Sequence, residues 1–330
     1  MTGITVKDLG PEYKFGSIVH GVTWDTLKDE SVRQQLRDIF EDRGLIVFEG
    51  VEASGKMQAE LSKVFGPLKD HPTASTPRVS EDYVPGLIDM HSQPRDISDG
   101  DLRGLVRKNG KILTRYSPWH FDHCYNDELN LAGVLRVVKN SPEGGRTGFS
   151  DGVAIYEAFD PELRDKIEGI NVLYTLDTRL TTMRFGRDFE TFGDSPGVRK
   201  TVEEAKIFPR AIHPAVFEHP TNGKKVLHIG PWMSVGLEHH EDEAGEALFE
   251  AACQELNKQA YAKAYWHNWK PNDMVVWDNR RLLHAVEGND PIYERQSQRT
   301  TIRGDYGLGY FEHGKKIGEV NREIAEEVVM

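Results

Sequence analysis

The segment Ser117–Tyr125 contains two side chains that could bind a metal ion together. It reads SPWHFDHCY, with His120 and Asp122 separated by one residue. In an extended chain, residues two apart point to the same side, so this imidazole and this carboxylate would lie next to each other. A second histidine from elsewhere would complete a set of three ligands that leaves positions open on iron, whereas zinc more often has four closed ligands or three and a water. We therefore take His120 and Asp122 as candidate ligands of a reactive metal.

The candidate third ligand is His284, which follows the compact apolar run Met274–Trp277. Taken alone, a histidine in this position is more typical of a structural residue. Two arginines, Arg295 and Arg299, come soon after it. The planar fork of an arginine matches a carboxylate, so either could bind an organic acid, although a lone arginine is also typical of a surface salt bridge.

A second His-x-Asp triplet, His240-Glu241-Asp242, occurs at the start of a predicted acidic helix. In a helix, residues two apart diverge by about 200°, so this pair would not chelate one ion. The triplet therefore indicates a solvated helix N-terminus.

The elements that must position these residues are short strands and a few helices. Apolar residues at helical spacing predict helices from about Val32 to Gly44, from Ser54 to Val64 and from Glu241 to Gln259. Strands are predicted at Leu45–Phe48, Leu131–Val138, Val172–Leu176, Lys225–Ile229, Met274–Trp277 and Arg299–Arg303. The pair Asn222-Gly223 predicts a hairpin with a type I′ turn, because both central positions of that turn need a positive φ. Together these elements predict a mainly β fold with flanking helices, as an antiparallel sandwich or jelly roll.

Two polar stretches without a clear period, residues 69–110 and 178–209, interrupt this pattern. Long insertions of this kind often form the lid or rim of an active site. No linker separates parts of the chain, so we expect residues 1–330 to form a single domain.

Composition narrows the class of protein. The net charge of −12 argues against a nucleic-acid partner, and no apolar run approaches the roughly 20 residues of a membrane-spanning helix. The N-terminus lacks the pattern of a secretory signal, and there are only two cysteines, Cys124 and Cys253. These features predict a soluble cytoplasmic protein with unpaired thiols. The aromatic residues around the metal motif could supply walls of a site, but strand alternation should direct half of them into the core; they are Tyr116, Trp119, Phe121 and Tyr125.

Several further motifs occur in order along the chain. They are Arg43–Phe48 (RGLIVF), Phe65–Leu68 (FGPL), Trp119–Asp122 (WHFD), Gly144–Thr147 (GGRT), His213–Val216 (HPAV), His219–Lys225 (HPTNGKK), Pro271–Asp273 (PND) and Trp277–Arg280 (WDNR), followed by His284 and the two arginines. As an ordered set covering most of the chain, they resemble the taurine dioxygenase and chlorophenoxyacetate dioxygenase family of iron and 2-oxoglutarate-dependent oxygenases.

The resemblance implies a double-stranded β-helix (jelly-roll) core and a role for each matching residue. His120, Asp122 and His284 match the family's Fe(II) ligands. Thr147 and Arg295 match the pair that binds the distal carboxylate of 2-oxoglutarate. In sulfonate-using members, the position of Arg299 contacts the anionic group of the substrate, and a histidine in the segment of His71 contacts the substrate. Tyr116 is a further candidate for substrate contact.

The resemblance also implies a reaction. 2-Oxoglutarate and O2 would be consumed, succinate and CO2 released, and an unactivated C–H bond of a small, anionic organic substrate oxidised, with hydroxylation as the default outcome. Asp122 argues against the related halogenases, which lack the carboxylate. Family members are often dimers or tetramers, so a homo-oligomer is expected, and residues 311–330 could be an interface helix or a frayed end.

Two alternatives remain open at this point. One is another metalloenzyme on a similar barrel, such as a cofactor-independent iron oxygenase or a zinc hydrolase, which would not need Thr147 with Arg295. The other is a non-catalytic binding or sensor protein, although such proteins usually lose a metal ligand.

Overall fold

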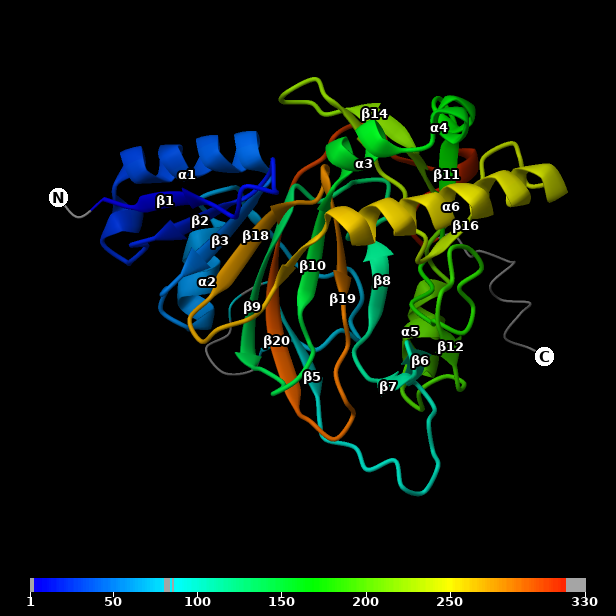
Figure 1. Ribbon diagram of the computed structural model, residues 1–330, viewed down its shortest axis with the longest axis horizontal. Coiled ribbons are helices and arrows are strands. Elements are labelled where there is room, and N and C mark those ends of the chain that lie inside the picture. Colours follow the sequence, from blue (N-terminus) through cyan, green and yellow to red (C-terminus); the bar gives the residue numbers. More distant parts are fainter. Residues whose placement is uncertain (1–2, 80–83, 85, 319–330) are drawn as a thin grey trace.

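The computed structural model describes residues 3–79, 84 and 86–318, and their architecture is mainly β. The largest sheet has eight strands (Figure 1). Across the sheet they run in the order β1 (Thr5–Asp8), β2 (Ser17–His20), β3 (Leu45–Glu49), β18 (Met274–Asp278), β9 (Ala132–Lys139), β20 (Arg295–Ile302) and β4 (Leu68–Lys69), and β5 (Leu87–Ser92) also pairs with β20. The pairs are antiparallel except for β2 with β3.

Two four-stranded sheets and two smaller ones complete the β structure. The second sheet has the order β17 (Tyr265–His267), β10 (Thr147–Asp151), β19 (Leu282–Val286) and β8 (Ser117–His120). The third has the order β16 (Ser234–Leu237), β11 (Asn171–Tyr174), β13 (Ala211–Pro214) and β21 (Tyr310–Phe311). The small sheets are β12 (Glu190–Thr191) with β6 (Val106–Lys108) and β7 (Lys111–Leu113), and the hairpin of β14 (Val216–Glu218) with β15 (Lys225–Leu227).

The helices lie outside the sheets (Figure 1). They are α1 (Glu30–Arg43), α2 (Gly55–Ser62), α3 (Gly152–Ala158), α4 (Pro161–Ile167), α5 (Val198–Ala205) and α6 (Glu243–Lys263), with short 3₁₀ turns at Thr26–Lys28 and Glu312–Gly314. In α1, the apolar face of Val32, Leu36 and Phe40 is buried against the large sheet. The helix ends where Gly44 adopts a φ of 72°, a left-handed conformation that costs glycine little.

Apolar side chains pack against both faces of the large sheet. One face packs against α1 and α2, through Val134 of β9, Met274 of β18 and Ile302 of β20. The other face turns toward the second sheet, where Trp277 and Phe149 meet. The inner face of the large sheet and the second sheet therefore enclose the space in which the candidate site lies.

The predicted helices and strands all form, with ends that shift by a few residues. The main correction to strand length is β20, which begins at Arg295 and not at Arg299. The stretch 69–110 is also more regular than its sequence indicates, because β5 within it pairs with β20 along six residues. The hydrogen-bond partner of β5 is more than 200 residues away, so no local pattern could reveal this strand.

The hairpin predicted at Asn222-Gly223 forms, but its predicted turn type is wrong. Glu218 pairs with Lys225, so six residues connect the two strands and not two. Gly223 has a φ of 65°, whereas Asn222 keeps a negative φ and accepts a hydrogen bond from the backbone N of Lys224. The asparagine acts through its side chain, as an Asx turn, and does not occupy a left-handed position.

Several other expectations can be compared with the structure. Cys124 and Cys253 are both buried and unpaired. Among the described residues, no helix is long and apolar enough to span a membrane. Of the C-terminal segment 311–330, the structure describes the end of β21 and a 3₁₀ turn, while residues 319–330 lie outside the described residues.

Candidate functional site

A cavity of about 470 Å³ lies between the large sheet and the second sheet. From the large sheet, alternate residues of β20 point into it, namely Arg295, Ser297 and Arg299. From the second sheet come Thr147 of β10 and His284 of β19. The 69–110 and 178–209 stretches also contribute to its wall, through His71, Thr73, Ser75, Thr76, Pro77, Ile88, Asp89, Met90, His91, Thr178 and Thr201.

The three predicted metal ligands meet in this cavity. His120 ends β8 and lies directly opposite His284 in the neighbouring strand β19, and their ring centroids are 4.1 Å apart. Asp122 follows two residues after His120, and one ligand atom from each of the three side chains lies within 4.8 Å of the others. Among the described residues, this is the only such group of three histidine, cysteine or acidic side chains.

The two imidazoles are suited to bind a metal. Nδ1 of His120 lies 2.8 Å from the carbonyl oxygen of Pro118 and donates to it, which leaves Nε2 free to coordinate. Nε2 of His284 faces Asp122 at 3.8 Å, and its Nδ1 is buried without a hydrogen-bond partner among the described residues. Burial lowers the pKa of His120 and of His284 below the ordinary value, so both rings are neutral at pH 7, the form that binds metals.

Asp122 is held at its backbone by one side chain from the turn after β18. Asn279 accepts a hydrogen bond from the Asp122 backbone N at 2.7 Å and donates to the Asp122 carbonyl oxygen at 3.0 Å. His228 in turn lies 2.9 Å from the Asn279 carbonyl oxygen and donates to it. The Trp277–Arg280 motif therefore positions a ligand that lies more than 150 residues earlier in the chain. The sequence shows this motif but indicates no role for Asn279.

The Asp122 carboxylate forms an ion pair with Arg299. Burial by itself would raise the pKa of Asp122, but the Arg299 guanidinium, with the imidazoles of His284 and His120, holds this pKa below its ordinary value. The carboxylate is therefore ionised and can serve as a ligand. Arg299 is thus next to the metal triad, at the metal end of the cavity.

Thr147 and Arg295 line another part of the same cavity. Trp269 donates a hydrogen bond from Nε1 to the Thr147 hydroxyl at 3.0 Å, so the proton of this hydroxyl is free to be donated elsewhere. Arg295 reaches only neutral acceptors among the described residues, the carbonyl oxygen of Gly145 at 3.1 Å and the Ser297 hydroxyl at 3.4 Å. A buried guanidinium without an acidic partner is suited to an anionic ligand.

His71 and Tyr116, the tentative substrate contacts, also line the cavity. Burial, with the charge of Arg299, lowers the pKa of His71 to about 4, and its ring packs edge-on against His123. Half of the aromatic residues of the motif lie in the core, but strand alternation does not explain the division, because Tyr125 lies beyond the end of β8. Trp119 and Phe121 are fully buried in the core, whereas Tyr116 and Tyr125 line the cavity.

The second His-x-Asp triplet has the structural role that its sequence indicates. Asp242 is the N-cap of α6 and accepts a hydrogen bond from the backbone N of Gly245 at 2.8 Å. His240 is exposed.

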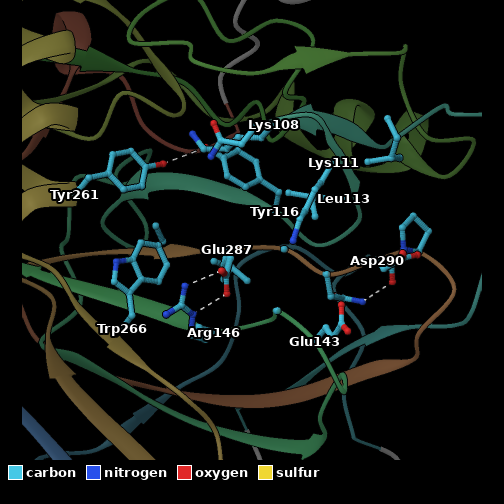
Figure 2. Close-up of a pocket in the computed structure, with 18 of the residues that line it drawn as sticks. Lys108, Lys111, Leu113, Tyr116, Glu143, Arg146, Tyr261, Trp266, Glu287 and Asp290 are labelled. Carbon is cyan, nitrogen blue, oxygen red and sulfur yellow. Dashed lines mark hydrogen bonds and ion pairs between the residues drawn. The ribbon is translucent and has the colours of Figure 1, made fainter.

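Figure 2 shows a second cavity, of about 590 Å³. Tyr116 and Val286 line both this cavity and the first. Two of the three cations in the second cavity, Arg146 and Lys108, are already paired. Arg146 forms two hydrogen bonds with Glu287, at 2.9 and 2.7 Å, and Lys108 forms an ion pair with Asp188 while lying over the rings of Tyr116 and Tyr261. This larger cavity contains none of the metal triad, so the chemistry belongs to the smaller one.

Comparison with known proteins agrees with this geometry. Residues 5–301 match the family described as "Taurine catabolism dioxygenase TauD, TfdA family". A (S)-phenoxypropionate/alpha-ketoglutarate-dioxygenase of Sphingobium herbicidovorans is 28% identical over 307 residues, which cover 90% of this chain and 95% of that protein. An alpha-ketoglutarate-dependent 2,4-dichlorophenoxyacetate dioxygenase of Cupriavidus pinatubonensis is 26% identical over 277 residues, covering 82% of this chain and 88% of that protein.

The fold is similar to that of solved structures as well. The crystal structure of AAD-2 in complex with Mn(II) and N-oxalylglycine has a TM-score of 0.66 at 21% identity, covering 91% of this chain and 97% of that chain. The family match spans most of the sequence and includes every residue of the candidate site. The chain therefore belongs to the TauD, TfdA family, and it is a non-haem iron dioxygenase that uses 2-oxoglutarate and O2.

Proposed function

We propose that His120, Asp122 and His284 hold Fe(II), and that Thr147 and Arg295 bind the distal carboxylate of 2-oxoglutarate. The observation that carries this proposal is the buried triad at 4.8 Å or less, with neutral imidazoles and an ionised carboxylate. Two imidazoles and one carboxylate on one side of a metal leave room for a bidentate co-substrate and O2. When bound, iron supplies the oxidising power that couples decarboxylation of 2-oxoglutarate to oxidation of a C–H bond.

The protein side chains orient the reactants. Pro118 fixes the tautomer of His120, and Asn279 fixes the backbone of Asp122, so the ligands are arranged before the metal arrives. The free proton of the Thr147 hydroxyl and the guanidinium of Arg295 hold one end of the co-substrate. Apolar side chains form part of the remaining wall, namely Ile88, Met90, Leu135, Leu176, Met233 and Trp277.

The prime substrate is a small organic anion that is hydroxylated, with release of succinate and CO2. Arg299 supports an anionic group, because its buried Nε has no hydrogen-bond partner among the described residues although Nη1 is paired with Asp122. His71 and Tyr116 line the same cavity. Relatives named for phenoxypropionate and 2,4-dichlorophenoxyacetate act on carboxylates that carry an apolar ring. A substrate of this class would place its carboxylate on Arg299 and its apolar part against the aliphatic wall.

Several wider features belong to the same proposal. The two facing sheets form a double-stranded β-helix (jelly-roll) core, residues 1–330 form a single domain, and residues 69–110 and 178–209 form the rim or lid. The enzyme acts in the cytoplasm as a homo-oligomer, a dimer or a tetramer. Light scattering of the purified protein tests the oligomer, and a monomer would contradict it.

The test of the proposed function is succinate formation by the purified enzyme with Fe(II), 2-oxoglutarate and O2. Asp122→Ala and His284→Ala should abolish it, because each removes a metal ligand. His240→Ala is the matched control, since it alters the other His-x-Asp triplet and should leave activity unchanged. Full activity of either ligand variant would show that the metal assignment is wrong. A panel of aryloxyalkanoates and their uncharged methyl esters tests the substrate class, and equal turnover of acid and ester would exclude a role for Arg299 in binding an anion.

A further inference from the structure

Arg115 is a third arginine in the cavity, and no sequence motif singles it out. It lines the same cavity as Arg295 and Thr147. Among the described residues, it has no ion-pair partner and its guanidinium donates no hydrogen bond. Burial lowers the pKa of this guanidinium below its ordinary value, although the group stays charged at pH 7. A half-buried cation without a hydrogen-bonded acidic partner is suited to bind an anionic ligand.

The backbone around Arg115 is arranged so that its side chain reaches the cavity. Arg115 has a φ of 56°, in the left-handed region, where a residue other than glycine is strained. A regular strand would send alternate residues to opposite sides. Here Arg115, Tyr116 and Ser117 all line the cavity, which a continuous extended strand would not allow. The strained residue therefore directs a charged side chain into the site.

Arg115 lies at the Arg295 end of the cavity and not at the metal end. Thr114 contacts Ser92 through their hydroxyl groups at 3.5 Å, and Ser92 is the residue that pairs with Arg295 in β5 and β20. Burial, with the nearby charge of Arg115, lowers the pKa of Arg295 to about 10. The charge of Arg299, by contrast, acts on the pKa values of Asp122, His120, His284 and His71.

The acidic group nearest to Arg115 in charge interaction, Asp89, is already engaged. Asp89 accepts hydrogen bonds from the amide of Gln296 at 2.8 and 3.0 Å and from that of Gln298 at 3.3 Å. These glutamines lie on the face of β20 opposite to Arg295. Asp89 lines the same cavity, but its hydrogen bonds go to these two amides, and among the described residues it forms no ion pair with Arg115 or Arg295.

We propose that Arg115 and Arg295, with Thr147, together bind the distal carboxylate of 2-oxoglutarate, so that Arg115 is a third co-substrate-positioning residue. This inference rests on the proposed co-substrate site. The two oxygen atoms of one carboxylate can accept hydrogen bonds from both guanidinium groups. The negative charge would also reduce the repulsion between the two cations. Arg299, which is ion-paired with Asp122, would then contact the prime substrate and not the co-substrate.

The test compares two 2-oxo acids of equal chain length, 2-oxoglutarate and 2-oxopentanoate, which lacks the distal carboxylate. Their dissociation constants for the Fe(II)-loaded enzyme are measured without O2, by calorimetry and by charge-transfer absorption. Arg115→Gln should weaken 2-oxoglutarate binding about 10- to 100-fold, as expected for loss of a charge-assisted contact, and leave 2-oxopentanoate unchanged. Arg107→Gln, which removes an exposed arginine paired with Glu190, is the matched control.

Arg115→Gly separates positioning from a structural role. Glycine removes the backbone strain at φ 56°, so the melting temperature should stay the same or rise while 2-oxoglutarate binding falls. If Arg115 had only a structural role, Arg115→Gly would lower both the melting temperature and the affinity for 2-oxoglutarate. Equal weakening of both oxo acids, or none for 2-oxoglutarate, would overturn the role of Arg115. If the unaltered enzyme does not prefer 2-oxoglutarate over 2-oxopentanoate, the distal-carboxylate site itself fails, and Arg115 with it.

Discussion

Arg281 forms a two-pronged buried ion pair with Asp151, with Nε to Oδ1 at 2.9 Å and Nη2 to Oδ2 at 2.8 Å. Asp151 ends β10, the strand that begins with Thr147, and Arg281 immediately precedes β19, the strand that carries His284. The pair therefore joins the strand of a proposed co-substrate contact to the strand of a proposed metal ligand. Both side chains are almost fully buried, so each charge is balanced by the other and not by solvent.

Replacing Arg281 with methionine should destabilise the fold by about 3–5 kcal/mol, because Asp151 would remain as a buried, unpaired carboxylate. Urea unfolding checks this value. The double variant Arg281→Met with Asp151→Leu should recover part of the loss, since it removes both charges. A single variant as stable as the unaltered protein would show that the ion pair contributes little to stability.

Asn279→Ala should weaken metal binding about 10- to 100-fold, because Asp122 would lose both hydrogen bonds that fix its backbone. Titration with Mn(II) measures this directly. Asn257→Ala is the matched control: Asn257 is also buried and donates to the Gly186 carbonyl oxygen at 2.7 Å, but it does not line the cavity. Both variants should lose stability, and only Asn279→Ala should lose metal affinity.

Gly133→Ala should destabilise the protein by about 1–3 kcal/mol through overpacking. A Cβ at Gly133 would lie 2.5 Å from the ring of Trp277, which is fully enclosed and packs 4.9 Å from the ring of His284. The tryptophan has to move, so metal affinity should fall together with stability. Gly197→Ala, where a Cβ meets nothing within 4 Å, should change neither. Thermal melts and Mn(II) titrations of both variants make the comparison.

Stability should decrease on acidification between about pH 6.5 and pH 4, partly because of His213. Burial lowers the pKa of this histidine to about 4, while its ring lies 2.7 Å from the Asn126 carbonyl oxygen and also contacts the Tyr306 hydroxyl. The unfolded chain, with an ordinary histidine pKa near about 6.5, binds a proton in this range that the folded chain does not, so lower pH favours unfolding. One such group contributes a slope of up to about 1.4 kcal/mol per pH unit.

His213→Gln should flatten this slope while lowering stability at pH 7.5, as measured by urea midpoints across the pH range. His240→Gln, which alters an exposed histidine, should leave the slope unchanged. The slope will not vanish in His213→Gln, since burial also lowers the pKa of His228, to about 3. An unchanged slope would mean that His213 is not neutral in the folded protein.

The sequence was most informative where local chemistry and local spacing coincide. His120 and Asp122 are two residues apart in an extended segment, and the structure brings them to one cavity with His284. Helix α1 could be predicted because its buried residues repeat at helical spacing and a glycine ends it. The strand β5, by contrast, depends on pairing with β20, and nothing within residues 87–92 indicates that partner.

The parts of the site that sequence reasoning missed share one physical cause. Asn279 acts on the backbone of a residue far away in the chain, and amide side chains carry no charge or spacing that would reveal such a contact. Arg115 reaches the cavity only because of a left-handed backbone conformation, which no periodic pattern encodes. Both residues gain their importance from tertiary geometry, and their residue types alone do not reveal it.

The strand β20 also fixes the distance between two arginines of the site. Arg295 and Arg299 point to the same side of it, four residues apart, so their Cα atoms are separated by about 13 Å. A rigid molecule with an acidic group at each end would engage both arginines only when its spacer matches that span. The affinity of inhibitors that bridge the two arginines should therefore depend more on the length of the spacer than on its chemistry. The backbone of a single strand sets the optimal length.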